Sequence, residues 1–330
     1  MENISNRVSY VQPLLHTCSR PQVLESGVRK NDHSGMGPGD VSRMAHNDIS
    51  SRLAGGKRLL LDGGTASELV RRGVTFPKGK AWSGTAVRDA PQVVRQVHED
   101  YLREGVDIVT ANSFCTSRIK LATVNIEDAA EELTRRAVEL AINARDAVRP
   151  DSIVAGSMSP MEASDIGKDI AEQAVWLAEA GADLLLYEWV GSIEDCVQGV
   201  QASQVGLPIF LGIRLLRMDG RMQYGNTVKE LARELRELKV DAVLAMCSQA
   251  EAISTALPNL RASFDLPLGA YAHNLDHIAP LTPERYTEFA HSWLEMGAQI
   301  VGGCCGTGPE HIRAIGSAVK GANPETTPAE

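Results

Sequence analysis

The chain has 330 residues, of which 43% are hydrophobic, 23% charged and 5% aromatic, which is typical of a globular protein with a substantial core. Its 33 basic and 42 acidic residues give a formal charge of −9 without a long basic run, which argues against a nucleic-acid partner or binding to an anionic membrane. No apolar stretch approaches the roughly 18 residues that span a bilayer, and six cysteines without a secretory leader indicate a reducing, cytoplasmic setting.

The first 55 residues differ in composition from the rest of the chain. Gly, Ser, Asn, Asp and His dominate residues 31–51, and neither a helical nor an alternating period runs through the segment. Such a stretch buries too little apolar surface to become ordered on its own. We therefore predict a flexible extension over 1–55, one folded domain over 56–320 and a short tail over 321–330.

From Arg58 onward, short apolar and β-branched runs alternate with longer segments of helical period. The short runs are nearly continuous in apolar residues, which is typical of parallel strands buried on both faces. Eight strands are predicted, over 58–62, 107–111, 152–157, 183–188, 208–213, 241–246, 267–272 and 299–303.

Helical patterns separate these strands, and the same helix-stop and strand-start sequence recurs as REGVD, EAGAD, LKVDA and EMGAQ. Eight such units over about 265 residues predict an α/β fold of the (β/α)8 TIM-barrel type. A doubly wound open sheet is the alternative, but the first strand–helix turn lacks the glycine spacing that binds dinucleotides. The clearest helices are predicted over 91–105, 127–148, 169–181, 227–238 and 282–297.

In a TIM barrel the active site lies at the carboxyl ends of the strands. Three cysteines are expected there: Cys247 after the sixth strand, and the adjacent Cys304 and Cys305 after the eighth. Three thiolates suit Zn²⁺ and leave a fourth coordination position open, as in catalytic zinc sites. The glycines beside the pair give the backbone freedom to turn both thiols toward one ion. Spacing alone leaves buried, inert cysteines as an equal alternative.

The segment GGCCGTG has a second interpretation as a phosphate-binding loop. TIM barrels often bind phosphate after the last two strands, and Gly306-Thr307-Gly308 precedes a helix that begins near Pro309. The chain would then act on a phosphorylated metabolite. A zinc-storing or scaffold barrel without catalysis is a third interpretation, and zinc content and a thiol-methylation assay distinguish the three.

Four segments resemble the homocysteine S-methyltransferase family. GGCCGTGPEHIRAI (302–315) is similar to the family's C-terminal motif and LDGGTASELVRRG (61–73) to its opening, while 81–114 and 184–195 resemble two blocks between them. The resemblance implies a TIM barrel, Zn²⁺ on Cys247, Cys304 and Cys305, homocysteine as the methyl acceptor and methionine as the product. Before Cys247, this chain has Met246 where the family usually has asparagine.

The amino-acid end of homocysteine needs its own contacts. Its ammonium group requires carboxylates, and Asp62 and Glu188 match acidic positions that the family uses for it. A helix cap is the alternative for Asp62, and a buried ion pair is the alternative for Glu188. The substrate carboxylate is expected on the backbone N–H groups of Gly64 and Thr65. Because the metal holds the substrate sulfur as a thiolate, no protein general base is assigned.

The methyl donor must be an onium cation, such as S-methylmethionine, S-adenosylmethionine, a dimethylsulfonio compound or a betaine, and aromatic rings recognise such cations. Trp82 matches a donor-side tryptophan of the family, with core packing as the alternative. Asn112, Cys115 and His273 complete the predicted donor pocket. Cys115 replaces a tyrosine of the betaine-using branch, which counts against betaine.

Some questions stay open at this point. Strand alternation predicts that Tyr187 and Trp189, on either side of Glu188, both point away from the site. The acceptor could also be a related thiol or selenol, such as selenohomocysteine. A homo-oligomer is compatible with the sequence.

Overall fold

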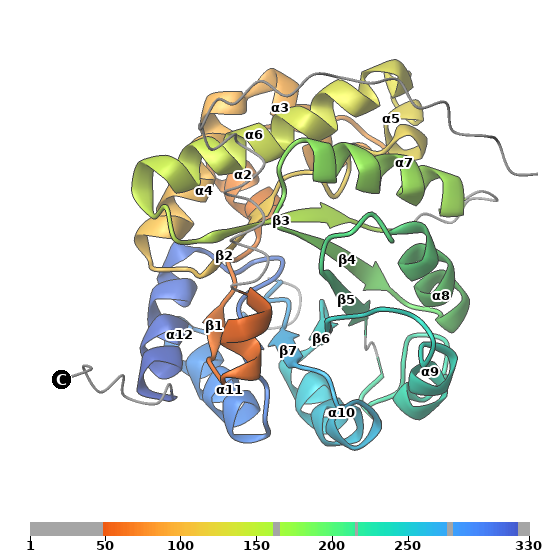
Figure 1. Ribbon diagram of the computed structural model, residues 1–330. Helices are drawn as coiled ribbons and strands as arrows, with labels where there is room; N and C mark the ends of the chain where they lie inside the picture. The colour runs from red at the N-terminus through yellow and green to blue at the C-terminus, as the bar shows by residue number, and fades with distance from the viewer. Residues whose placement is uncertain (1–48, 161–165, 215–216, 276–279, 323–330) are drawn as a thin grey trace, which may run out of the picture. The chain divides into compact units, whose positions relative to one another are not determined.

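Eight parallel strands form the centre of the fold in the computed structural model, which describes residues 49–160, 166–214, 217–275 and 280–322. Neighbouring strands follow chain order from β2 to β8, β8 pairs with β1, and a parallel bridge between Leu61 and Ile108 joins β1 to β2. The predicted (β/α)8 TIM barrel is confirmed (Figure 1). The strands are β1 (Leu59–Leu60), β2 (Ile108–Ala111), β3 (Ile153–Met158), β4 (Leu184–Val190), β5 (Ile209–Arg214), β6 (Ala242–Met246), β7 (Leu268–Tyr271) and β8 (Ile300–Val301).

Helices connect successive strands and surround the barrel (Figure 1). Each of the five predicted helices is present, and the segment 127–148 divides into a 3-10 turn and a long α-helix. The α-helices are α2 (Thr65–Arg71), α3 (Ala86–Asp89), α4 (Pro91–Arg103), α5 (Arg118–Ala122), α6 (Ala130–Val148), α7 (Ile166–Glu179), α8 (Ile193–Ala202), α9 (Val228–Glu234), α10 (Ala250–Ser263), α11 (Pro283–Glu295) and α12 (Pro309–Ala322), and the 3-10 turns are η1 (Trp82–Thr85) and η2 (Glu127–Ala129).

The recurring aspartate before the strands has a structural role at the amino ends of the barrel. Asp107, Asp183 and Asp241 each accept a hydrogen bond from a backbone N–H of the preceding strand, at 2.8–3.0 Å. These carboxylates satisfy N–H groups that no strand partner reaches. The repeated sequence therefore supports the register of the barrel and lies at the end opposite the strand carboxyl ends.

Two apolar clusters hold the barrel together. The larger one lies between the strands and the surrounding helices. The smaller one fills the barrel interior with inward-facing side chains such as Leu61, Ile108, Leu186 and Phe210. Strand side chains alternate between these two clusters, which explains why the strands are apolar throughout.

The boundary of the predicted flexible extension requires a correction. Residues 49–54 form a helix, and its Ile49 and Leu53 are buried with the side chains of the barrel interior. The Gln299 side-chain amide, which precedes β8, donates to the Leu53 carbonyl at 2.8 Å. Apolar contact with the amino-terminal end of the barrel orders a segment whose own composition is polar. Residues 1–48 and 323–330 of the predicted extension and tail lie outside the described residues.

No helix within the described ranges is both long enough and apolar enough to cross a membrane.

Candidate active site

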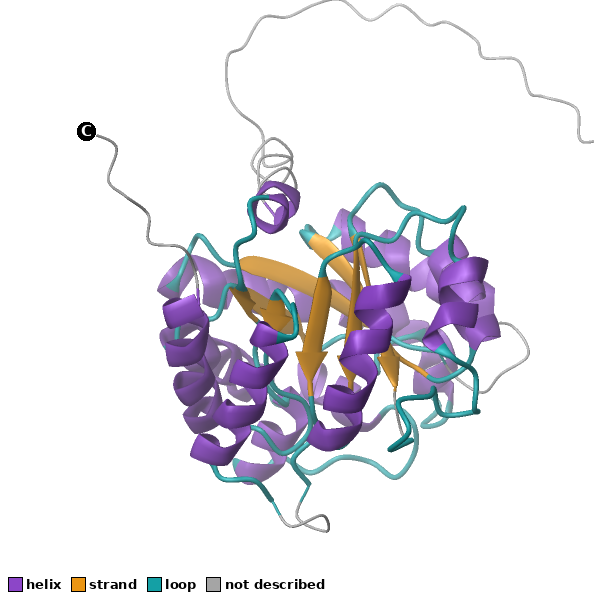
Figure 2. Ribbon diagram, turned by 90° about the horizontal axis from the view of Figure 1, so that it is seen from below, coloured by secondary structure: helices purple, strands orange, loops and turns teal. Residues whose placement is uncertain are grey.

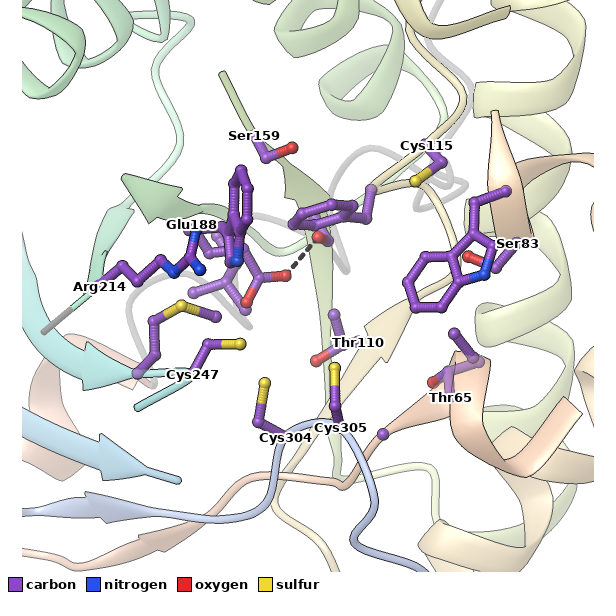
Figure 3. Close-up of a pocket in the computed structure, with 18 of the residues that line it drawn as sticks. Thr65, Ser83, Thr110, Cys115, Ser159, Glu188, Arg214, Cys247, Cys304 and Cys305 are labelled. Atoms are coloured by element: carbon purple, nitrogen blue, oxygen red, sulfur yellow. Dashed lines mark hydrogen bonds between the residues drawn. The ribbon is translucent and has the colours of Figure 1, made fainter. Parts of the chain in front are cut away.

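A cavity of about 600 Å³ lies at the carboxyl ends of the parallel strands, which the arrowheads mark in Figure 2. Its lining comes from the ends of β1 to β8 and from the loops that follow them. The volume falls within the range of small-molecule sites. Ten of its lining residues are labelled in Figure 3.

Three cysteine sulfurs converge on this cavity. The Sγ atoms of Cys247, Cys304 and Cys305 lie within 4.8 Å of one another, and Figure 3 shows all three directed into the same space. These thiols, like those of Cys115 and Cys196, are free of disulfides. Among the described residues, these three cysteines form the cluster of potential metal ligands (His, Cys, Asp or Glu) that is close enough to hold a metal ion.

The backbone at both strand ends brings the thiols together. Cys247 has a left-handed φ of 46°, which is uncommon for a residue with a side chain, and its N–H donates to the Tyr271 carbonyl at 3.1 Å. Gly306 has a φ of 81°, and a Cβ there would lie 1.8 Å from the Asn274 carbonyl oxygen. Only glycine therefore permits the tight turn after Cys305, whose carbonyl accepts from the Asn274 N–H.

Crowding of the three thiols makes the first proton easy to lose and the others difficult. Hydrogen bonds from Cys247 and Cys304 lower the pKa of the Cys305 thiol to about 3, and the nearby His273 contributes in the same direction. Hydrogen bonding to Cys247 and Cys305, together with burial, raises the pKa of Cys304. A cation at this position would remove that conflict, because metal binding favours the thiolate form of every ligand.

Asp62 lies beside the sulfur cluster at the end of β1. Its carboxylate oxygens accept hydrogen bonds from the backbone N–H and the hydroxyl of Thr110, each at 2.7 Å. The N-cap of α2 is Gly64, without a side-chain cap, so Asp62 is not the helix cap that was its alternative role. Burial raises the pKa of Asp62 to about 7, and the negative charge of Glu188 acts in the same direction.

Glu188 lies at the end of β4. Its carboxylate accepts hydrogen bonds from the hydroxyls of Ser157 at 2.5 Å and Tyr271 at 2.9 Å. Within the described residues no basic side chain forms a salt bridge with it, so the buried ion pair that was its alternative is absent there. Burial raises the pKa of Glu188 to about 7. Two buried carboxylates that form no salt bridge among the described residues can thus bind a substrate ammonium group.

The expected use of the Gly64 N–H requires a correction. That N–H donates to the Thr307 carbonyl at 3.0 Å, so it is already engaged within the protein. The Thr65 N–H, at the start of α2, has no acceptor among the described residues. Both residues line the cavity. Only Thr65 therefore offers a backbone donor to a ligand at this position.

The predicted donor-side residues occupy different environments. Trp82, Asn112 and Cys115 line the cavity, whereas His273 is absent from its lining. The Asn112 side-chain amide donates to the Ser83 carbonyl at 2.9 Å and so holds the turn that carries Trp82. The Trp82 ring is 40% exposed, which is incompatible with simple core packing. Burial raises the pKa of the Cys115 thiol, which therefore remains a neutral part of the wall.

Strand alternation holds for Tyr187 but is wrong for Trp189. The Tyr187 hydroxyl donates to the Asp195 carbonyl at 2.9 Å on the helix side of the strand. The register of β4 with β5 shifts between Tyr187 and Val190, and Trp189 has a left-handed φ of 64°. This irregularity turns Trp189 into the cavity lining. A β-bulge has no clear sequence pattern here, so sequence reasoning missed this residue.

Sequence reasoning also missed Arg214 and Lys120, which both line the cavity. The guanidinium of Arg214 stacks over the Trp189 ring, with 4.2 Å between its carbon and the ring centroid. The buried Lys120 ammonium donates to the carbonyl and hydroxyl of Ser159 and to the Phe114 carbonyl. Lys120 therefore joins the turns after β2 and β3, while Arg214 faces the cavity.

The loop at 302–308 does not form a phosphate cradle. The Gly306 N–H donates to the Ser67 hydroxyl, and the Thr307 N–H to the Cys304 carbonyl. The Gly308 N–H donates to His311 at 3.4 Å. Because these donors are used within the protein, the alternative function on a phosphorylated metabolite is not favoured.

Comparison with known proteins gives a consistent result. A family model described as homocysteine S-methyltransferase matches residues 59–319. Homocysteine S-methyltransferase YbgG of Bacillus subtilis is 27% identical over 78% of this chain and 93% of its own, and homocysteine S-methyltransferase 4 of Zea mays is 26% identical over 89% and 98%. The oxidized form of the homocysteine methyltransferase MmuM of Escherichia coli superposes with a TM-score of 0.70 at 25% identity, covering 79% of this chain and 95% of that one. Its metallated form, at 24% identity, has a TM-score of 0.71 over 81% and 98%.

Proposed function

The chain belongs to the homocysteine S-methyltransferase family, and from this premise we propose that it methylates homocysteine with an onium donor, using Zn²⁺ held by Cys247, Cys304 and Cys305. The observation that carries this proposal is the convergence of three thiols beside two buried carboxylates in one cavity. Thiols provide the metal ligands, and the carboxylates provide the contact for an amino acid.

The cysteine cluster fits a zinc ion in chemistry and spacing. Zinc prefers thiolate ligands in a tetrahedral arrangement, in which sulfurs about 2.3 Å from the ion are roughly 3.8 Å apart. The three Sγ atoms lie within 4.8 Å of one another, which is compatible with that spacing. A metallated form is also known of MmuM. When bound, the ion supplies a positive charge that lowers the pKa of a thiol entering its open position.

The chain's own residues orient the amino-acid end of homocysteine. We expect the ammonium group to contact the carboxylates of Asp62 and Glu188, which form no salt bridge among the described residues. We expect the substrate carboxylate to bind the Thr65 N–H, because that of Gly64 already donates to the Thr307 carbonyl. These contacts direct the sulfur toward the cysteine cluster and leave the rest of the cavity for the donor.

Methyl transfer then needs only alignment. The homocysteine thiol gives its proton to solvent, and its sulfur forms a bond to the donor methyl carbon. The bond between that carbon and the onium atom breaks, and its electron pair stays on the onium atom, which becomes neutral. Orientation of the two reactants at about 3–3.5 Å replaces a general base. The exposed ring of Trp82 contributes a face for the cationic donor.

A donor screen tests the proposal. Zinc-loaded protein is incubated with homocysteine and, in turn, S-methylmethionine, S-adenosylmethionine, dimethylsulfoniopropionate and betaine. We expect methionine from at least one of the sulfonium donors and little from betaine, measured by mass spectrometry together with the demethylated donor. Zinc-loaded protein that gives no methionine from any donor would support the scaffold alternative. A parallel arm with selenohomocysteine defines the acceptor.

Homocysteine affinity is expected to decrease as the pH falls below about 7. The carboxyl groups of Asp62 and Glu188 have pKa values raised by burial to about 7, so below that pH both become protonated and lose their charge. Each protonation that opposes ammonium binding weakens affinity by up to about tenfold per pH unit. Isothermal titration of homocysteine between pH 5.5 and 8.5 measures this slope.

The variant Asp62→Asn separates this effect from ionisation of the substrate thiol. Ionisation of the homocysteine thiol affects the pH dependence of binding equally in both proteins. Only the natural protein also has a carboxyl group at residue 62. The slope below pH 7 should therefore be shallower in Asp62→Asn. Equal slopes would show that the Asp62 carboxyl does not bind the ammonium group.

The cysteines and the barrel also suggest a cellular compartment and the extent of the catalytic domain. The disulfide-free thiols of the described cysteines suit a reducing compartment, and we propose the cytoplasm. We also propose residues 56–320 as the catalytic domain, with the helix at 49–54 covering its amino-terminal end.

A further inference from the structure

The cavity contains a cationic side chain that the proposed function does not use. Arg214 is the last residue of β5, and its partner across the sheet is Met246, the residue before Cys247. On the same strand Phe210 faces the barrel interior, so strand alternation directs Arg214 to that face as well. Arg214 accordingly lines the cavity, and Figure 3 shows it on the side of Cys247. Its positive charge is therefore placed beside the cysteine cluster.

The polar groups of this arginine are not all satisfied within the protein. Its Nε is buried without a hydrogen-bond partner, and Arg214 forms no salt bridge among the described residues. Glu188 lies on the same side of the cavity, but its carboxylate accepts from the hydroxyls of Ser157 and Tyr271. A cation in a cavity wall without an anionic partner is unfavourable. The arrangement therefore indicates that an anion completes this part of the site when a ligand is bound.

Trp189 holds the guanidinium in place. Its φ of 64° is an outlier for a tryptophan, and it lies where β4 shifts register against β5. The ring is stacked against the Arg214 guanidinium, with 4.2 Å between the ring centroid and the guanidinium carbon. Such backbone strain is typical of ligand contacts. The stack restricts the side chain and leaves its charge available to a ligand.

The charge at the cysteine cluster changes during the proposed reaction. Three cysteine thiolates exceed the charge of a bound Zn²⁺ by one, and a homocysteine thiolate adds a second excess negative charge when its proton leaves to solvent. Methyl transfer removes this added charge, because the sulfur of methionine is a neutral thioether. A fixed positive charge in the cavity wall therefore stabilises the substrate complex more than the product complex.

We propose that Arg214, held by Trp189, supplies the positive charge that balances the homocysteine thiolate, so that the site prefers the substrate thiolate to the product thioether. The inference rests on the proposed function, because it assumes that homocysteine binds as a thiolate at the cysteine cluster. Arg214 has a specificity role here and is neither a metal ligand nor a contact of the transferred methyl group. The same preference assists product release, because the attraction disappears when the thiolate is methylated.

Binding measurements with homocysteine and methionine test this inference without turnover. The two ligands share the ammonium and carboxylate groups and differ at sulfur, which is a thiolate in one complex and a neutral thioether in the other. Isothermal titration of zinc-loaded protein gives both dissociation constants. Arg214→Gln should weaken homocysteine binding about tenfold, as expected for the loss of one partly buried charge pair, and leave methionine binding unchanged. Arg214→Lys keeps the charge and should retain most of the preference.

Matched controls identify the outcomes that overturn the inference. Arg217→Gln changes an exposed arginine that pairs with Asp219 in the following loop, and the affinity for both ligands should stay the same. Zinc content should be equal in all variants, because Arg214 is not a ligand. If Arg214→Gln weakens homocysteine and methionine equally, lowers zinc content or leaves homocysteine affinity unchanged, the inference is wrong. If the preference depends on Arg214 but no donor yields methionine, the inference holds and the proposed methyl transfer fails.

Discussion

Replacing Cys304 with serine is expected to reduce the metal content from about one ion per chain to less than a tenth, and to reduce kcat on the order of a thousandfold. A serine hydroxyl does not ionise at neutral pH, so the site loses one of its three soft anionic ligands. Without the ion, a substrate thiol with a pKa of about 8.5 is only a few per cent thiolate at pH 7. Loss of positioning accounts for the remaining factor. Metal analysis of the purified variant and its rate of methionine formation measure both effects.

Two controls make this result interpretable. Cys196→Ala removes a buried thiol from α8, outside the cavity lining, and should keep the metal and the activity. Circular dichroism should show that Cys304→Ser retains the barrel, because the apolar clusters that hold it are unchanged. Undiminished turnover in a metal-free Cys304→Ser protein would contradict the proposed mechanism.

Replacing Asp62 with asparagine is expected to raise the KM for homocysteine by about 10- to 100-fold while the metal content stays the same. Asparagine can keep both contacts with Thr110, since its oxygen accepts from the N–H and its amide donates to the hydroxyl. What disappears is the negative charge that faces the ammonium group. Glu188→Gln should act in the same direction, because the hydroxyls of Ser157 and Tyr271 can reorient toward an amide.

Asp107→Asn is the matched control for this prediction. Asp107 also accepts a backbone N–H, that of Leu60, but it precedes β2 and is absent from the cavity lining. It should change stability slightly and leave the homocysteine KM unaltered. Loss of metal in Asp62→Asn, or an equal KM effect in Asp107→Asn, would show that Asp62 serves the fold or the metal and not the substrate. Initial rates at saturating donor concentration separate these cases.

The barrel could be predicted from the sequence because its signals are local. Each strand is a short apolar run, and four of the eight follow the recurring helix-stop and strand-start sequence, three of them with an aspartate. The observed strands begin and end within two residues of the predicted ones. The helix at 49–54 was missed because its order comes from contact with the barrel interior and not from its own composition.

The candidate site was only partly predictable. Cys247, Cys304, Cys305, Asp62 and Glu188 could be identified because they follow apolar strands, and the structure gathers them around one cavity. Trp189 could not be identified in this way. Its position depends on a register shift between two strands and on a left-handed backbone conformation, and neither follows from the alternation of side chains. Arg214 directly follows the predicted strand 208–213, so the same rule could have identified it.

The sequence by itself determined which chemical groups are present and at which end of the barrel they lie, because strand direction follows from local patterning and all parallel strands point the same way. Tertiary structure decided which of those groups remain available to a ligand. The Gly64 N–H is used by Thr307, whereas the buried Nε of Arg214 has no hydrogen-bond partner among the described residues. A polar group is available to a ligand only if no residue from a distant part of the chain forms a hydrogen bond with it. Such long-range hydrogen bonds form only when the barrel closes.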